Sequence, residues 1–261
     1  MQLLVTNDDG ISAPGLHALA GALVDAGHQV LVAAPDRDCS GQSASIGPVH
    51  LSGQVVYERV DIEGVDAEAV SVEGPPALAV MAACLGGFGP APDLVVAGIN
   101  AGANTGRAIL HSGTVGAALT AANFGVPGLA VSQAGRGSYQ WASAALWAVA
   151  LVDHAAALQQ LAVLNLNVPN LALPEIRGLR QAALEAGGVV QSGVAERPTG
   201  GVLELQFQRL GPPAEGSDSA LLAEGYATLT ALLGPAAAGL DLAPVCRRAE
   251  RSLTSARRIP A

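Results

Sequence analysis

A short apolar run near the start of the chain passes abruptly into polar residues, and this pattern strongly constrains the fold. Residues 3–5 are Leu-Leu-Val, and residues 6–10 are Thr-Asn-Asp-Asp-Gly. Such a run predicts a buried strand whose carboxyl end enters a tight loop. A helical pattern over residues 14–24 and a second apolar run over residues 29–34 follow. Strand, helix and strand in this order predict the beginning of a doubly wound α/β sheet.

The same alternation continues through much of the chain. Apolar runs predict strands, and Ala-rich segments predict helices. The expected strands lie at residues 93–97, 128–132 and 163–167, and the expected helices at residues 75–85, 115–123 and 139–161. Residues 49–72 alternate more loosely, which indicates a small antiparallel excursion.

The character of the chain changes near Pro169, where Gly and Pro begin to separate shorter segments. We expect a hairpin strand at residues 202–210, a loop at 211–219, a short strand within 224–233 and a frayed helix at 247–258. These features divide the chain into a core over residues 1–168 and an extension over residues 169–261, which we expect to pack on a neighbouring subunit.

The composition excludes several classes of function. All 13 basic residues are Arg, so neither a Walker-type phosphate loop nor a Schiff base can form. The net charge of -9 and the pI near 4.9 argue against a nucleic-acid polymer or an anionic membrane as partner. No GxGxxG fingerprint occurs, and no apolar run reaches the roughly 20 residues of a membrane span. Three widely spaced cysteines and a first strand that starts near Met1 predict a cytoplasmic protein with reduced thiols.

Polar side chains follow three of the predicted strands. Asp8 and Asp9 follow the first, Ser40 lies in the loop after the second, and Asn100 ends the third. The carboxyl ends of parallel strands share one sheet edge, so these side chains are expected to converge. Adjacent carboxylates raise each other's pKa unless a positive charge lies between them. The all-oxygen set suits Mg²⁺ or Mn²⁺. The alternative is a solvated turn in which Asp8 caps the next helix.

Three further features lie at or near these loops. Asn7 is expected to fix its loop through backbone hydrogen bonds, and Arg37 to pair with Asp36 or Asp38. The Ser-Gly-Thr sequence at residues 112–114 precedes a predicted helix and offers amides and hydroxyls to an anion, although on its own it is better explained as an ordinary N-cap. A metal site on the same edge favours phosphate, for which Arg107 is a further candidate.

Several of these motifs, in this order, resemble the survival protein SurE family. They are Thr-Asn-Asp-Asp-Gly at residues 6–10, Ala-Pro-Asp-Arg at 34–37, Ala-Gly-Ile-Asn-Ala-Gly at 97–102, Ser-Gly-Thr-Val at 112–115 and Asn-Leu-Asn-Val-Pro at 165–169. The resemblance implies a Rossmann-like three-layer α/β sandwich with a mainly parallel sheet. It also implies a β-rich carboxy-terminal extension used in oligomerisation, in a homodimer or homotetramer.

The resemblance further implies a metal-dependent nucleotidase that hydrolyses nucleoside 5'- and 3'-monophosphates, with one divalent ion per subunit. It makes Asp8 and Asp9 catalytic residues. The implied metal ligands are Asp8, Asp9, Ser40 and Asn100, and the implied phosphate-binding residues are Asn104, Ser112, Gly113 and Thr114.

The chain departs from the family pattern at three places. Glu73-Gly-Pro-Pro stands where Gly-Thr-Pro followed by Asp is usual, Thr120 replaces a Glu, and His111 replaces a Tyr. These departures leave open the alternative of a non-catalytic nucleotide or metal sensor on the same fold.

Overall fold

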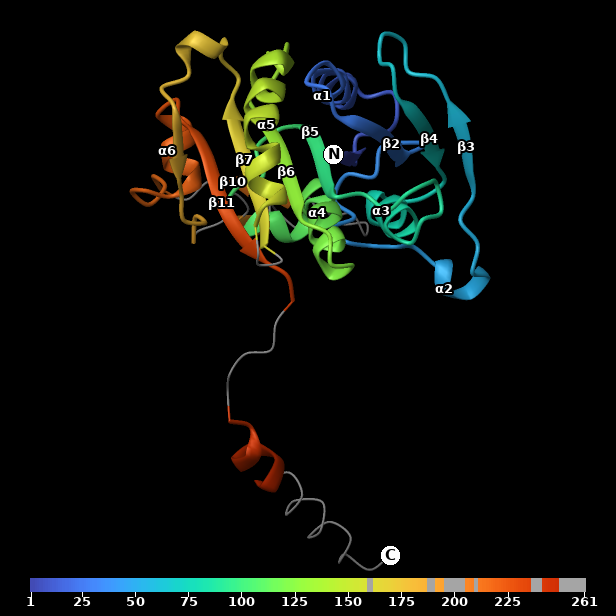
Figure 1. Cartoon of the computed structure of the whole chain (residues 1–261). Helices are drawn as coiled ribbons and strands as arrows, with labels where there is room; N and C mark the ends of the chain where they lie inside the picture. Colours follow the sequence, from blue (N-terminus) through green and yellow to red (C-terminus); the bar gives the residue numbers. More distant parts are fainter. Residues whose placement is uncertain (159–161, 187–190, 195–204, 209–210, 236–240, 249–261) are drawn as a thin grey trace, which may run out of the picture.

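The chain forms a three-layer α/β sandwich around one large sheet, as seen in a computed structural model (Figure 1). The structure describes residues 1–158, 162–186, 191–194, 205–208, 211–235 and 241–248. Within these ranges the sheet has nine strands. From one edge to the other they are β3 (Tyr57–Val60), β4 (Glu68–Val72), β2 (Gln29–Pro35), β1 (Gln2–Thr6), β5 (Leu94–Ala101), β6 (Gly128–Ala134), β7 (Ala162–Pro169), β11 (Ala227–Leu233) and β8 (Leu179–Gln181).

Six neighbouring strands, from β4 to β7, run parallel. Helices α1 (Pro14–Asp25) and α5 (Trp141–Ala156) cover one face of this parallel part, and α3 (Pro76–Cys84) and α4 (Gly113–Asn123) cover the other (Figure 1). Both faces of β1 are therefore buried: Leu3 and Val5 pack into the α1 and α5 layer, and Leu4 packs into the α3 and α4 layer. Burial on both faces explains why the strand sequences are continuously apolar rather than alternating.

The strand order reverses between β1 and β5. The chain passes from β1 to β2 and β4 on one side and returns to β5 on the other, so the carboxyl ends of β1 and β5 meet at the switch point where ligands bind in such sheets. One extra residue in β5 interrupts its pairing with β6, because Ala97 pairs with Ala130 but Asn100 pairs with Ser132. This bulge sets the position of Asn100 at the sheet edge.

Shorter elements complete the described fold. They are α2 (Val49–Ser52), the 3-10 helices η1 (Gly106–His111) and η2 (Leu173–Glu175), an antiparallel pair of β9 (Gln191–Val194) and β10 (Leu205–Gln208), and α6 (Asp218–Ala223). Residues 243–248 are also helical. None of the helices in the described ranges has the length and apolar character needed to cross a membrane.

The α/β class and the mainly parallel sheet are confirmed, as are the expected core strands and helices. Two expectations need correction. The excursion at residues 49–72 is antiparallel only between β3 and β4, because β4 itself joins the main sheet parallel to β2. The expected loop at residues 211–219 already contains the start of α6, whose N-cap Ser217 accepts a hydrogen bond from the Ala220 N–H at 3.2 Å. The six residues of α6 are too short a segment to show a helical period in the sequence.

The region after Pro169 contributes β11 to the main sheet, antiparallel to β7. The hairpin expected near residues 202–210 corresponds to the β9–β10 pair in the described residues, and most of the expected tail helix, residues 249–258, lies outside them. The division at residue 168 and the subunit contact stay predictions.

Two helical glycines provide a matched test of packing. A Cβ at Gly116 in α4 would lie 2.6 Å from the Ala44 amide nitrogen, whereas a Cβ at Gly21 in α1 would have only the Val65 side chain at 3.9 Å. We expect Gly116→Ala to lower the free energy of unfolding by about 1–3 kcal/mol through overpacking. Gly21→Ala should raise it by about 0.5–1 kcal/mol through helix propensity. Urea unfolding measures both, and equal effects at the two positions would contradict this packing.

Candidate functional site

The loop after β1 is held by Asn7, as the sequence predicted. Its side-chain oxygen accepts the Gly10 N–H at 3.2 Å, and its amide nitrogen donates to the Gly10 carbonyl at 3.1 Å. Gly10 has φ +102°, and a Cβ there would lie 3.2 Å from the Arg37 backbone. The loop is therefore closed by Asn7 and pressed against the loop after β2, which brings the two predicted ligand segments together.

Asp8 lies at the amino end of α4 and is only 3% exposed. Its Oδ2 accepts the Gly113 N–H at 3.1 Å, and its Oδ1 accepts the Thr114 hydroxyl. A Cβ at Gly113 would lie 2.7 Å from the Asp8 side chain, so only glycine admits this approach. The two donors at the amino end of α4 fix the position of the Asp8 side chain. The Gly113 amide, expected to serve a phosphate, thus holds Asp8 in the structure.

Asn100 presents its side-chain oxygen to the same place. Its amide nitrogen donates to the Gly102 carbonyl at 2.9 Å, which fixes the side-chain orientation, and its Oδ1 lies 3.4 Å from the Thr114 hydroxyl. Because that hydroxyl also donates to Asp8, the oxygens of Asp8 and Asn100 converge on one point.

Asp9 is the electrostatically unfavourable member of the site. Burial raises its pKa most, and the neighbouring Asp8 raises it further. A hydrogen bond from the Ala101 backbone lowers the pKa, and Asp38 raises it slightly. The resulting pKa is about 6. A carboxyl group in such surroundings favours either a proton or a nearby cation.

Ser40 is exposed and linked to Asp38, a carboxylate that sequence reasoning treated only as an ion-pair partner. Asp38 Oδ1 accepts the Ser40 N–H at 2.8 Å, and the side-chain and backbone hydrogen bonds from Ser40 hold the pKa of Asp38 below its usual value. Cys39, between them, donates its N–H to the Asp8 carbonyl at 2.7 Å. An acidic residue two positions before a serine was the available signal, because Asp often accepts the amide two residues on.

Asn104 is held by two asparagines of β7. Its N–H donates to Asn167 Oδ1 at 2.8 Å, and its carbonyl accepts the Asn165 and Asn167 side-chain amides, both at 2.9 Å. Its own side-chain amide donates to Ser132 at 2.8 Å. Asn165 and Asn167 are fully buried and were not predicted as part of the site, although their motif had been noted.

Asp218, at the start of α6, anchors the other side of that loop. Its fully buried carboxylate accepts the N–H groups of Gly106 at 2.7 Å, Glu185 at 3.0 Å and Ser219 at 2.7 Å. The Ser219 hydroxyl also donates to Thr105 at 3.0 Å. Sequence reasoning missed Asp218 because no motif links it to residues more than a hundred positions earlier.

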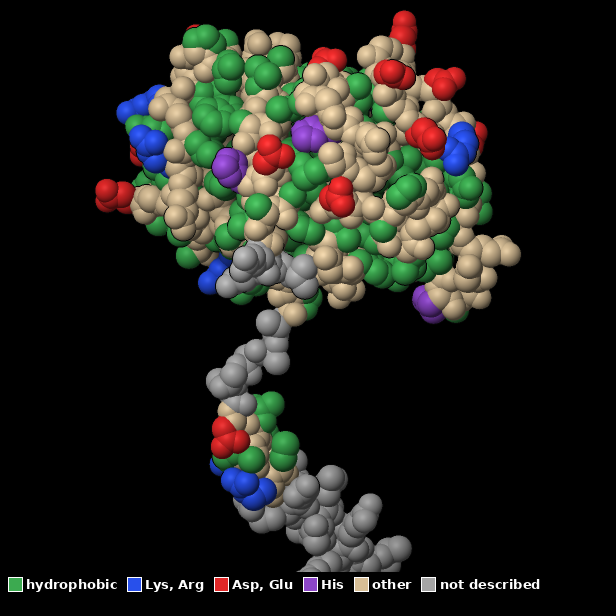
Figure 2. All heavy atoms as spheres, viewed as in Figure 1, with side chains coloured by type: hydrophobic (Ala, Val, Ile, Leu, Met, Phe, Trp, Pro, Cys, Tyr) green, Lys and Arg blue, Asp and Glu red, His purple; other side chains and the backbone are tan. Residues whose placement is uncertain are grey.

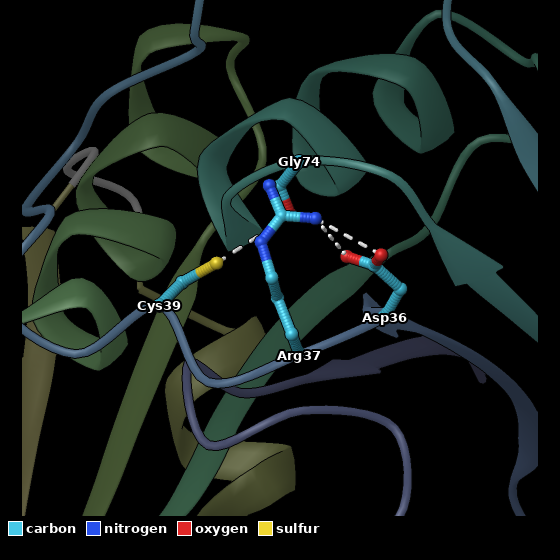
Figure 3. A network of polar contacts seen from close by, with 4 residues as sticks. All are labelled: Asp36, Arg37, Cys39 and Gly74. Carbon is cyan, nitrogen blue, oxygen red and sulfur yellow. Dashed lines mark hydrogen bonds and ion pairs between the residues drawn. The ribbon is translucent and has the colours of Figure 1, made fainter.

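Ser112 is the N-cap of α4, since its hydroxyl accepts the Val115 N–H at 3.1 Å. Arg107 and His111 lie on η1 with exposed side chains. Arg37 pairs with Asp36, with one nitrogen 2.9 and 3.0 Å from the two carboxylate oxygens (Figure 3). On the face drawn in Figure 2, the Arg side chains lie in small separate groups and form no continuous basic patch.

The donor set fits a hard divalent cation. Asp8, Asp9 and Asn100 offer oxygen atoms at the switch point, and a hard cation prefers oxygen. Across the described residues, no group of three or more His, Cys, Asp and Glu could hold a metal, so a zinc-type cluster is absent from that part of the chain. The convergence of Asp8 and Asn100 and the raised pKa of Asp9 are the observations that favour a cation here.

Fold and site together define an α/β protein with an oxygen-donor centre at the switch point of a doubly wound sheet. The family model of the survival protein SurE matches residues 3–188. The chain therefore belongs to the SurE family, whose members are generally metal-dependent phosphatases. It is also similar to the crystal structure of the SurE protein from Aquifex aeolicus, with 28% identity, coverage of 96% of this chain and 100% of that chain, and a TM-score of 0.80.

Removal of the Asp218 carboxylate should loosen the Asn104 loop. Asp218→Ala leaves three buried N–H groups without their acceptor, so we expect the free energy of unfolding to fall by about 3 kcal/mol or more. Asp218→Asn, which keeps one acceptor oxygen, should cost less. Asp241→Ala is the control, because Asp241 accepts the Ala243 N–H in an exposed stretch. Urea unfolding of the three variants measures this, and equal losses for Asp218→Ala and Asp241→Ala would contradict the anchoring role.

Asp9 should destabilise the metal-free protein at alkaline pH. Its folded-state pKa of about 6 exceeds the ordinary value of 3.8 for an Asp side chain, so its stabilising contribution is present at low pH and is lost as the pH rises through about 6. In EDTA, Asp9→Asn should raise stability at pH 8 by about 1 kcal/mol, allowing for partial exposure, and by much less at pH 4. Thermal unfolding measures both values.

Asp61→Asn, which removes an exposed carboxylate, is the control for this experiment and should change neither value. Added Mn²⁺ should raise the unfolding temperature of the wild type more than that of Asp9→Asn, because a cation that binds the folded state stabilises it. An equal gain in stability for Asp9→Asn at both pH values would show that the negative charge of Asp9 does not cause the lower stability at alkaline pH.

Proposed function

We propose that this chain is a phosphomonoesterase that hydrolyses nucleoside 5'- and 3'-monophosphates to nucleoside and phosphate, with one Mg²⁺ or Mn²⁺ ion per subunit. The observation that carries the proposal is the position of Asp8. This buried carboxylate is fixed by Gly113 and Thr114 at the switch point, opposite the side-chain oxygen of Asn100.

Asp8, Asp9, Ser40 and Asn100 would hold the cation. When bound, it would supply positive charge to a phosphoryl group and make it more susceptible to attack. Asn104, from the loop clamped by β7, and Ser112, Gly113 and Thr114, from the start of α4, would position the phosphate. The Gly113 N–H and the Thr114 hydroxyl donate to Asp8 in this structure, so the phosphate would share these donors with Asp8 or replace it. The amino end of a helix favours an anion, which supports this assignment.

Water is the favoured nucleophile, and Asp9 would accept its proton. Asp9 follows Asp8 at the carboxyl end of β1, so its carboxylate would lie beside the reacting groups, and a positioned carboxylate can act as a general base. Asp8 is less suited to direct attack, because both of its oxygens accept hydrogen bonds and it is fixed in place. Its role in this scheme is to orient the reacting groups.

Family membership also supports a small nucleotide as substrate, a homodimer or homotetramer with residues 169–261 at the subunit contact, and a cytoplasmic location. The second candidate is a non-catalytic nucleotide or metal sensor, suggested by the departures at Glu73-Gly-Pro-Pro and Thr120. The Thr120 hydroxyl donates to the Gly116 carbonyl at 2.8 Å inside α4. Thr120 is not among the residues that hold Asp8, which are Gly113 and Thr114.

A phosphate-release assay tests the reaction. With AMP or GMP and Mn²⁺, the wild type should release phosphate, and EDTA should abolish the release. Asp8→Asn should lower kcat/KM at least about 100-fold, because it removes charge from the centre of the site. Asp61→Asn, which removes an exposed carboxylate, should keep full activity. Activity that survives both EDTA and Asp8→Asn would refute the scheme, and tight nucleotide binding without turnover under any divalent ion would favour the sensor.

A further inference from the structure

A cavity of about 390 Å³ lies beside the candidate site, at the carboxyl ends of β2 and β4. This volume falls in the range of small-molecule sites. Its wall includes the polar side chains of Arg37, Gln42, Gln54 and Glu73, and Val56 and Leu78 are among its apolar members. None of these residues belongs to the proposed metal or phosphate set.

The cavity and the candidate site share one loop. Cys39 donates its N–H to the Asp8 carbonyl at 2.7 Å, while its thiol donates to the Gly74 carbonyl, in the cavity wall, at 3.9 Å (Figure 3). Ser40 follows Cys39, and Gln42 in the wall is two residues further on. Two residues of extended chain span at most about 7 Å. A molecule whose phosphate lies beside the cation proposed at Asp8 and Ser40 can therefore extend its other end into the cavity.

We infer that this cavity receives the nucleoside part of the substrate and that Glu73 selects a guanine base. The inference rests on the proposed function and deepens it. It assigns a role to the Glu73-Gly-Pro-Pro segment, the departure from the family pattern that the metal and phosphate set leaves unused.

The chemistry of the wall favours a base with adjacent donors. Glu73 is exposed immediately after β4, and among the described residues none forms an ion pair with it. An ionised carboxylate only accepts hydrogen bonds. Pro75, in the same wall, has no N–H to donate. Guanine places its N1–H and N2 amino group side by side, so both can donate to the two carboxylate oxygens, whereas adenine places an acceptor at N1.

Arg37, also in the wall, supplies a flat surface. Its two hydrogen bonds to Asp36 hold the guanidinium in place, and a guanidinium plane can stack on an aromatic ring. The apolar members Val56 and Leu78 can cover the rest of the base. The cavity therefore combines stacking surface with an acceptor edge, which is the combination that a guanine requires.

The test compares kcat/KM for GMP and AMP in the presence of Mn²⁺. The wild type should prefer GMP, and Glu73→Gln and Glu73→Ala should each lower the GMP-to-AMP ratio at least about tenfold, because a missing acceptor leaves the guanine donors unpaired. Glu63→Gln is the control. Glu63 is an exposed glutamate in the turn between β3 and β4, at the amino end of β4, whereas Glu73 lies at its carboxyl end. Glu63→Gln should leave the ratio unchanged.

A second variant tests the location without changing Glu73. Val56 is 60% exposed and lines the cavity, so Val56→Trp should fill it and raise KM for both nucleotides at least about tenfold relative to ribose 5-phosphate, which has no base. Ribose 5-phosphate also separates the two hypotheses. Absence of phosphate release from every substrate would overturn the proposed function. Release with a GMP-to-AMP ratio that stays constant in both Glu73 variants, or with KM values unaffected by Val56→Trp, would overturn this inference alone.

Discussion

A buried carboxylate is stable only where hydrogen bonds replace the water that it loses, and Asp8 meets this condition at the amino end of α4. The Gly113 N–H and the Thr114 hydroxyl each donate to one of its oxygens. This contact joins residues more than a hundred positions apart and fixes α4 relative to β1. The same Thr114 hydroxyl lies beside the Asn100 oxygen, so one helix start determines where the donors from β1 and β5 meet.

A second layer of hydrogen bonds fixes the loop that faces this contact. Asn165 and Asn167 hold Asn104 from β7, and Asp218 holds Gly106 from the start of α6. β7 and α6 therefore hold the loop through its backbone groups, without contributing residues to the proposed metal centre. Buried amide and carboxylate groups with several partners each are suited to this task, because breaking one bond leaves a polar group without water.

The residues of the site differ in how far the sequence could predict them. Asp8, Asp9 and Asn100 could be predicted to lie close together because each comes at the end of an apolar run, and the ends of parallel strands share an edge; their role as metal ligands stays a prediction. Asn7 was found because its hydrogen bonds are local. Asp38 was overlooked, although its hydrogen bond from the amide two residues on is a local pattern. Asp218 was not found, since its role depends on which backbone groups the fold brings within reach. The partner of the Gly113 amide was missed for the same reason: the sequence showed a donor at a helix start but not that Asp8 would reach it. Helix α6 was missed because six residues are too few to display a period.

The arrangement also separates reaction from recognition. The proposed reacting groups come from the ends of β1 and β5, whereas the cavity is built by the segments that follow β2 and β4 and by the approach to β3. Cys39 connects the two through its backbone N–H and its thiol, not through a charged group. A substitution at Glu73 can therefore change which base is accepted without moving Asp8. Because the Glu73 side chain makes no hydrogen bond or ion pair with the proposed reacting groups in the described part of the chain, this separation would allow the specificity of such a chain to change while its reaction chemistry is retained.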